Sequence, residues 1–118
     1  MKPESEIKLP PQNLAAEQSV LRAMLLDNAV ADDALAEMSA DDIHSHANRI
    51  VFDTMLDLIR VGKPASALTI ADELERLGKL AEVGGWERLH QLLDSLPSEV
   101  THVRYHARIV REIGRAHV

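Results

Sequence analysis

The sequence predicts an all-α fold, a compact bundle of six or seven short helices. In one segment after another, apolar residues recur at the three- and four-residue spacing of a helix. Residues that favour helix ends, namely Ser, Asp, Asn, Gly and Pro, stand between these segments. No stretch alternates apolar and polar residues as a half-buried strand does. Together the three observations indicate helices joined by short turns.

The first helix is expected over residues 14–27, directly after the restricted backbone of Pro10 and Pro11. Asn13 is the expected N-cap, because its side chain can accept from a free amide of the first turn. Glu17 is close enough to that turn to favour the positive end of the same helix. The two prolines thus give the chain a fixed entry direction.

A short second helix should follow, capped by Asp27 or Asn28 and ending near Met38. The sequence Ser-Ala-Asp-Asp at 39–42 has the spacing of a capping box and predicts a single helical turn.

The most apolar helix is expected over residues 48–61, and Gly62 and Pro64 should end it. Its apolar residues cover more than one narrow stripe, which indicates the central and most buried helix. They are Ile50, Val51, Phe52, Met55, Leu56, Leu58 and Ile59.

Three further helices are expected in the second half of the chain. Thr69 should cap the first of them, which ends at Gly78. The glycine pair at 84–85 should open the next, which Pro97 breaks, and Ser98 should cap the last.

Composition limits the classes of function. At 118 residues the chain is one domain, and with no cysteine it holds neither disulfides nor thiolate metal sites. No apolar run approaches the ~18 residues of a membrane span, so we expect a cytoplasmic protein with no membrane contact. Residues 1–97 carry 9 basic and 17 acidic side chains, and residues 98–118 carry 4 and 2. This distribution favours protein partners over nucleic acid.

Motifs for catalysis or cofactors are missing from the sequence. Neither a phosphate-binding loop nor a dinucleotide fingerprint is present, so we expect no catalytic and no cofactor site in this segment. His44 and His46 lie near acidic residues, but no third ligand has a recognised spacing. His102 and His106 share a helix face without the glutamate of a zinc-binding helix. We therefore expect no metal site.

Two surface features allow more than one interpretation. Trp86 is expected in the core, and the alternative is an exposed anchor for a partner. An acidic group is expected to be a solvated face, and the alternative is a docking face for a basic partner. The group comprises Asp32, Asp33, Glu37, Asp41 and Asp42.

Residues 68–93 superficially resemble a helix-turn-helix unit. The second helix carries a nearly neutral mixture of side chains, whereas a recognition helix needs cations and base-edge donors. The connection is also longer than the usual ~3–4 residues. A free-standing all-α DNA-binding regulator therefore remains the alternative function.

The order of several short motifs resembles the N-terminal domain of DnaB-type replicative DNA helicases. The resemblance covers residues 9–112, with departures from the usual pattern at Arg22, Asn48 and Ser66. The matching pieces are LPPQNLAAEQSVL at 9–21, RIVFDTM at 49–55, LTIADELERLGKLAEVGGWERL at 68–89 and RIVRE at 108–112.

The resemblance implies a collar domain of a helicase ring. Such a domain pairs subunits within the hexamer and docks primase and the helicase loader during DNA replication. The ATPase that drives 5'-to-3' unwinding, with its ATP and Mg, is expected outside this segment, and DNA is expected to bind only to the full-length ring.

The resemblance also divides the chain. We expect a flexible leader at 1–8, a globular helical head at 9–97 and the first arm of a helical hairpin at 98–112. Residues 113–118 depart from the family pattern and look like the translation of a sequencing-library adapter, so we expect a non-native tail there.

The last helix has the pattern of a subunit interface. One apolar seam at spacings of 3, 4 and 3 is predicted to meet a second subunit, and the alternative is packing on the domain's own core. The seam comprises Val100, Val103, Ala107 and Val110; Tyr105 and Ile109 form a second strip, and Arg104 and Arg108 supply cations.

Overall fold

The computed structural model describes residues 11–94 and 102–116, and helices dominate both ranges. The α-helices are α1 (Pro11–Leu26), α2 (Ala31–Glu37), α3 (His46–Arg60), α4 (Ala67–Arg76), α5 (Gly85–Asp94) and α6 (Val103–Ala116). Three 3-10 turns connect them: η2 (Asn28–Val30), η3 (Ala40–Asp42) and η4 (Leu80–Val83). No strand occurs in the described residues, so the all-α prediction is confirmed.

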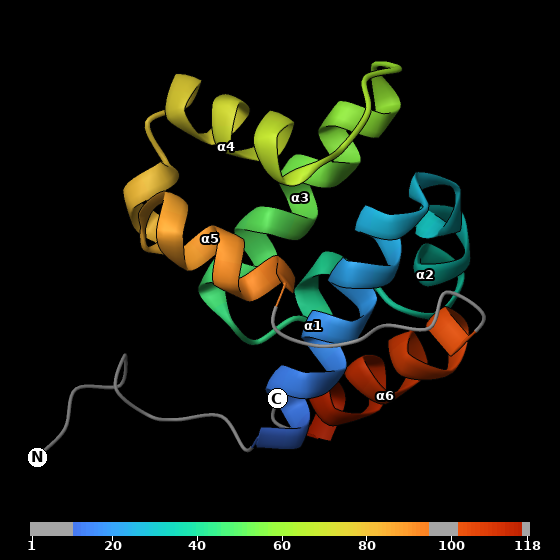
Figure 1. The fold of residues 1–118 in the computed structure, drawn as a ribbon. Helices are drawn as coiled ribbons and strands as arrows, with labels where there is room; N and C mark the ends of the chain where they lie inside the picture. The colour runs from blue at the N-terminus through green and yellow to red at the C-terminus, as the bar shows by residue number, and fades with distance from the viewer. Residues whose placement is uncertain (1–10, 95–101, 117–118) are drawn as a thin grey trace, which may run out of the picture.

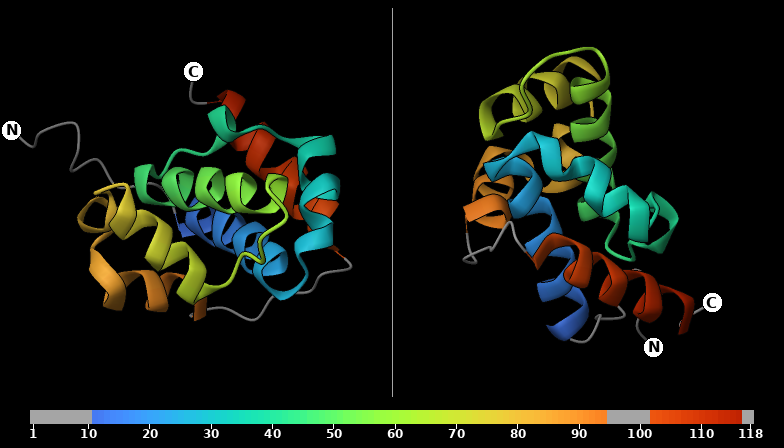
Figure 2. Two further views of the ribbon diagram at one scale, coloured as in Figure 1. Left: turned by 90° about the horizontal axis from the view of Figure 1, so that it is seen from above. Right: turned by 90° about the vertical axis from the view of Figure 1, so that its right-hand side faces the viewer.

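The helices form two groups that share α1 (Figure 1). On one side α4 packs against α3, and α5 packs against both α1 and α4. On the other side α6 lies along α1 and α2, as the additional views in Figure 2 also show. The core therefore continues from the α4–α5 end to the α2–α6 end.

As predicted, α3 lies at the centre of the core. Its Val51, Phe52 and Met55 side chains are completely buried, and Ile50, Leu56 and Leu58 are nearly so. Ile59 is partly buried against the same cluster. From α1, the side chains of Val20, Leu21 and Met24 complete this region. Burial of these side chains is the main favourable contribution to folding.

Several predicted helix ends are confirmed. The Asp27 carboxylate accepts from the Ala29 amide at 3.0 Å and caps η2. The Asp42 carboxylate accepts from the Ser39 amide at 3.0 Å, as a capping box requires. α4 ends at Arg76, and Gly78 then adopts a positive φ of 72° that stops the helix.

Two predicted N-caps are wrong by one turn. α1 begins at Pro11, so Asn13 already lies inside the helix. Proline is well suited to a first helical position because it has no backbone N–H that would be left without an acceptor there. Thr69 is the third residue of α4, whose N-cap is Ser66. The Ser66 hydroxyl accepts from the Thr69 amide at 3.2 Å, and the Thr69 hydroxyl accepts from the Ser66 amide at 2.8 Å. Ser98, the predicted cap of the last helix, lies outside the described residues.

Asn28 holds the loop before α4 in place. Its amide nitrogen donates to the Met24 carbonyl at 2.8 Å and to the Ala65 carbonyl at 3.1 Å. Its amide oxygen accepts from the Ala65 backbone amide at 2.9 Å. One side chain thus joins the end of α1 to a loop 37 residues away in the sequence.

Candidate protein-docking surfaces

The predicted seam of α6 faces the interior of the chain's own core. Val103, Ala107 and Val110 are buried and belong to the main hydrophobic cluster, and Ile109 packs against its edge. Val100 lies outside the described residues. The apolar residues whose spacing favoured a subunit interface therefore pack on their own chain, where α6 lies along α1 and α2. This corrects the partner-seam prediction for these three residues.

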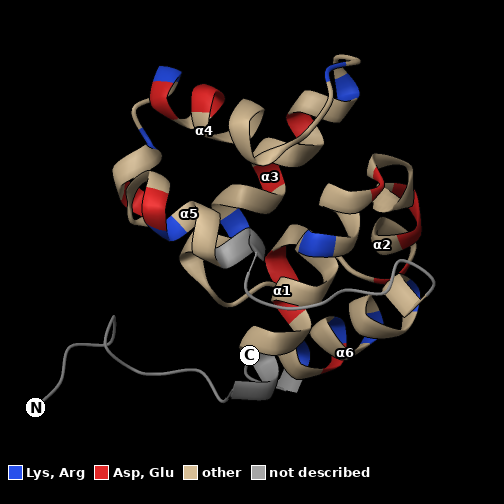
Figure 3. Ribbon diagram, viewed as in Figure 1, with Lys and Arg blue, Asp and Glu red and all other residues tan. Residues whose placement is uncertain are grey.

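The cations of α6 pair with the acidic group on α2. An Arg104 guanidinium nitrogen lies 2.9 Å from the Asp33 carboxylate, and an Arg108 nitrogen lies 3.5 Å from Glu37. Figure 3 shows basic positions along α6 next to acidic positions on α2. Two of the five acidic residues, Asp33 and Glu37, therefore already have a basic partner within the same chain, whereas the sequence interpretation left the whole group to solvent or to another protein.

The outward side of α6 offers the remaining candidate interface. Tyr105 has 62% of its surface exposed, and Arg104 and Arg108 are exposed beside it. The Tyr105 ring lies 6.0 Å from the His106 ring, centroid to centroid. Tyr105, Arg104 and Arg108 are the predicted interface residues of α6 that a second protein can reach without opening the head.

Glu17 holds the start of α3, and not the start of its own helix as the sequence suggested. Its carboxylate is 3% exposed and accepts from the His44 amide at 2.8 Å and the Ser45 amide at 3.3 Å. It also accepts from the Asn48 side-chain nitrogen at 2.9 Å. These donors lie at or just before the first turn of α3, so a negative charge there complements the positive helix end. Sequence spacing gives no signal for this contact, because the partners are 27 to 31 residues apart.

Asn48, one of the departures from the family pattern, is completely buried in this network. Its side-chain nitrogen contacts Glu17, while its side-chain oxygen has no hydrogen-bond partner among the described residues. The departure therefore affects the α1–α3 junction and leaves the outer surface unchanged.

The histidines do not form a metal site in the described residues. No group of three or more metal-ligating side chains occurs there. One His44 ring nitrogen lies 3.2 Å from the Gly114 carbonyl of α6, and a His46 ring nitrogen lies 3.7 Å from Glu82. His44 thus takes part in helix packing.

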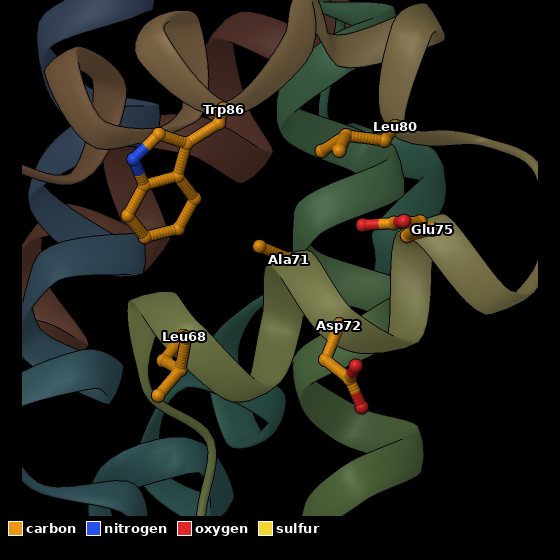
Figure 4. Close-up of a pocket in the computed structure, with 6 residues that line it drawn as sticks. All are labelled: Leu68, Ala71, Asp72, Glu75, Leu80 and Trp86. Atoms are coloured by element: carbon orange, nitrogen blue, oxygen red, sulfur yellow. The ribbon is translucent and has the colours of Figure 1, made fainter.

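Trp86 is not a core residue, which corrects the sequence prediction. It is 43% exposed at the start of α5, and its ring lies 5.9 Å from the His90 ring in an edge-on arrangement. Together with Leu68, Ala71, Asp72, Glu75 and Leu80 it lines a cavity of about 220 Å³ (Figure 4). We call this the α4–α5 groove. Exposure follows from position: α4 passes beside the indole without covering it.

Beside the groove, Glu73 and Arg76 form a well-aligned pair. The guanidinium donates to both carboxylate oxygens at 2.7 Å, and this hydrogen bonding lowers the pKa of Glu73 below its ordinary value. The same contact raises the pKa of Arg76. Arg76 is thus engaged by Glu73, the residue next to the groove-lining Asp72.

Within the described ranges, no helix is both long and apolar enough to cross a membrane.

The fold and these surfaces define a small all-α domain with an exposed aromatic groove on one side and an exposed tyrosine between arginines on the other. Residues 9–112 match the family model described as "DnaB-like helicase N terminal domain". The chain belongs to this family.

Two relatives are much longer than this chain and are named as replicative DNA helicases. Over 87% of its length the chain is 44% identical to a protein of Mycobacterium leprae named replicative DNA helicase DnaB, covering 17% of that relative. It is 37% identical over 89% of its length to the replicative DNA helicase DnaB of Leifsonia xyli, covering 23% of that protein. The chain thus spans about a fifth of the length of these relatives.

A solved structure has the same fold. The crystal structure of the N-terminal domain of DnaB helicase from Mycobacterium tuberculosis matches with a TM-score of 0.81 and 42% identity. The match covers 92% of this chain and 78% of the crystallised chain.

Proposed function

We propose that this chain is the N-terminal collar domain of a replicative DNA helicase, which pairs subunits in the hexameric ring and docks primase and the helicase loader. The observation that carries the proposal is the family match over residues 9–112. The likeness to the mycobacterial domain, with its TM-score of 0.81, supports it. A free-standing regulator is less consistent with these matches, because the relatives that align with most of this chain are named as replicative DNA helicases.

Subunit pairing in this proposal uses the outer side of α6. The buried seam cannot meet another subunit without exposing the core, whereas Tyr105 is open to solvent. Interfaces are enriched in tyrosine and arginine because these side chains combine apolar area with hydrogen bonding. Tyr105 with Arg104 and Arg108 on either side has this composition. Their ion pairs with α2 also hold the two arginines in defined positions.

Catalysis in this proposal belongs to the rest of the helicase. ATP and Mg bind an ATPase domain outside these residues, and DNA is contacted by the assembled ring in the cytoplasm. The sequence contains no phosphate-binding loop, in agreement with this division of labour.

A domain exchange tests the proposal. Residues 9–112 replace the corresponding domain of the Mycobacterium tuberculosis helicase, and the chimera is compared with the parent and with a version that lacks the domain. We expect the chimera to sediment as a ring and to bind mycobacterial primase, and the deleted version to lose primase binding. A chimera that folds, yet behaves like the deletion in both assays, would contradict the proposal.

The alternative regulator predicts a different result for the isolated chain. Duplex DNA should then bind at moderate salt with affinity falling steeply as salt increases. We expect negligible binding, because the chain carries a net charge of −6.

A further inference from the structure

The α4–α5 groove combines two exposed apolar side chains with two acidic ones. Leu68 is 71% exposed, an unusual position for a leucine beside another exposed apolar residue, Trp86. Figure 4 shows the indole ring extending from α5 toward Leu68, with Ala71 at the base and Leu80 on the far side. Asp72 and Glu75 lie along the same stripe of α4.

The carboxylates of the groove form no hydrogen bond or contact ion pair within the described residues. Arg76 is hydrogen-bonded to Glu73, which is the main cause of its raised pKa, and the nearby Asp72 charge adds to this without a direct contact. An apolar floor beside two carboxylates without a bonded partner is complementary to an apolar side chain flanked by cations. The acidic residues Asp33 and Glu37 of α2 are already paired with arginines of α6. Compared with that surface, the groove is better able to bind the cations of a partner.

The volume of the groove is better suited to a single side chain of a protein partner than to a small-molecule ligand. Sites for small ligands usually enclose ~300–1,000 Å³, and this cavity of about 220 Å³ is smaller and open along one side. It accommodates one bulky side chain of a partner. The groove-lining positions 68, 71, 72 and 75 of α4 form a straight helical stripe, the arrangement against which an amphipathic helix packs.

We propose that the α4–α5 groove binds an amphipathic helix of a protein partner, which inserts an apolar side chain between Leu68 and Trp86 and places Lys or Arg beside Asp72 and Glu75. The inference rests on the proposed docking function for its biological context and specifies the chemistry of one docking segment. Primase and loader need not be the partner for the groove to act in this way.

Trp86 supplies the measurement, because it is the only tryptophan of the chain. The probe is a tryptophan-free amphipathic peptide of about 15 residues, long enough to form a helix, with leucines on one face and lysines beside them. A matched probe carries glutamates in place of the lysines. We expect the lysine probe to shift Trp86 emission to shorter wavelength in a saturable way, and the glutamate probe to leave it unchanged.

Variants of the chain locate the binding. Leu68→Ala should weaken the affinity for the lysine probe about tenfold, because an anchor contact of the bound helix is lost. Leu26→Ala removes another strongly exposed leucine (59%) outside the groove and should leave the affinity for the lysine probe unchanged. The double variant Asp72→Lys with Glu75→Lys should reject the lysine probe and bind the glutamate probe. Circular dichroism checks that each variant remains helical.

Three results would overturn the inference. The first is that the lysine probe leaves Trp86 emission unchanged, and the second is that Leu26→Ala and Leu68→Ala weaken binding of the lysine probe equally. The third is that removal of residues 1–8 alone shifts Trp86 emission, which would show that the chain's own leader fills the groove. Each can occur while the helicase chimera works normally, so failure here is separate from failure of the proposed function.

Discussion

At the residue scale, the buried carboxylate of Glu17 is expected to contribute strongly to stability. Its buried carboxylate accepts three hydrogen bonds from the start of α3, two of them from backbone amides. Glu17→Gln keeps the shape but turns an amide group toward these donors. We expect a loss of about 2–3 kcal/mol in the free energy of unfolding, because charge-assisted bonds are lost and a buried donor remains unpaired.

Urea unfolding of this variant, compared with Glu87→Gln at an exposed position, measures the loss. A Glu17→Gln protein as stable as the control would show that the carboxylate does not hold α3.

The Glu73–Arg76 pair gives a pH-dependent prediction. Arg76 lowers the pKa of Glu73, so the pair contributes stability above the unfolded pKa, and this contribution is lost as pH falls through the lower folded pKa. Arg76→Gln should return the Glu73 pKa toward its ordinary value, since hydrogen bonding to the guanidinium is its largest cause. Carboxyl chemical shifts followed by NMR during an acid titration test this. An unchanged Glu73 pKa in the variant would mean that another group lowers it.

At the element scale, α6 approaches η3 closely at one glycine. A Cβ atom at Gly114 would lie 2.6 Å from the Asp42 carbonyl oxygen, which belongs to the backbone and cannot move aside easily. In an ordinary helix, replacing glycine by alanine stabilises by about 1 kcal/mol. Here we expect Gly114→Ala to destabilise by about 1–3 kcal/mol, because the helix must shift. Thermal unfolding, with the exposed neighbour Arg115→Ala as the control, decides the sign.

Gly114 belongs to the segment expected to be a non-native tail, yet Ile113–Ala116 continue α6. Gly114 lies against Asp42 and accepts a contact from the His44 ring at its carbonyl, so this segment packs on the domain. Sequencing the encoding DNA tests the expectation of a non-native tail.

The apolar stripe of α6 gives a second prediction at this scale. Val103→Asp would bury a carboxylate among apolar side chains, so we expect it to cost about 3 kcal/mol or more and to unfold the head. Tyr105→Asp, on the exposed side of the same helix, should change stability by less than about 0.5 kcal/mol. Helical circular dichroism in urea compares the two. If Val103→Asp stayed fully folded, the stripe would not be part of the core.

Local features of the fold were predictable from sequence, and contacts between distant segments were not. Asp27, Ser39 and Gly78 mark helix ends through bonds or backbone conformations within a few residues, so their spacing carries the information. The N-caps at Asn13 and Thr69 were misplaced because Pro11 suits the first position of α1 and Ser66 caps α4 one turn earlier.

For the candidate surfaces, the sequence showed which residues are apolar or charged, but it did not show which of them face the core and which face solvent. The sequence pattern of Val103, Ala107 and Val110 is the same whether these residues contact another subunit or the chain's own α1 and α2. Trp86 is large and apolar, so its partial exposure depends on how α4 passes beside it. The Glu17 contacts arise only when α1 and the start of α3 meet in space.

At the scale of the whole molecule, two surfaces remain on opposite parts of a closed head. The outer side of α6 carries Tyr105 between arginines, and the α4–α5 groove carries Trp86 beside carboxylates. The arginines of the first surface are already paired with Asp33 and Glu37, whereas Asp72 and Glu75 of the second form no ion pair within the described residues, so the two surfaces suit partners of different chemistry. In the proposed function, one surface would contact a neighbouring subunit and the other an auxiliary protein.

The central claim is that α6 completes the core of its own chain and leaves partner binding to the outer surface. Hydrogen exchange of the α6 amides, measured at several protein concentrations, tests it most directly. We predict that the amides of Ala107 and Val110, which lie beyond the first turn of α6, exchange as slowly as those in the centre of α3 at every concentration, because both open only when the domain unfolds. Fast α6 exchange in dilute protein that becomes slow only at high concentration would place this helix in a subunit interface and contradict the claim.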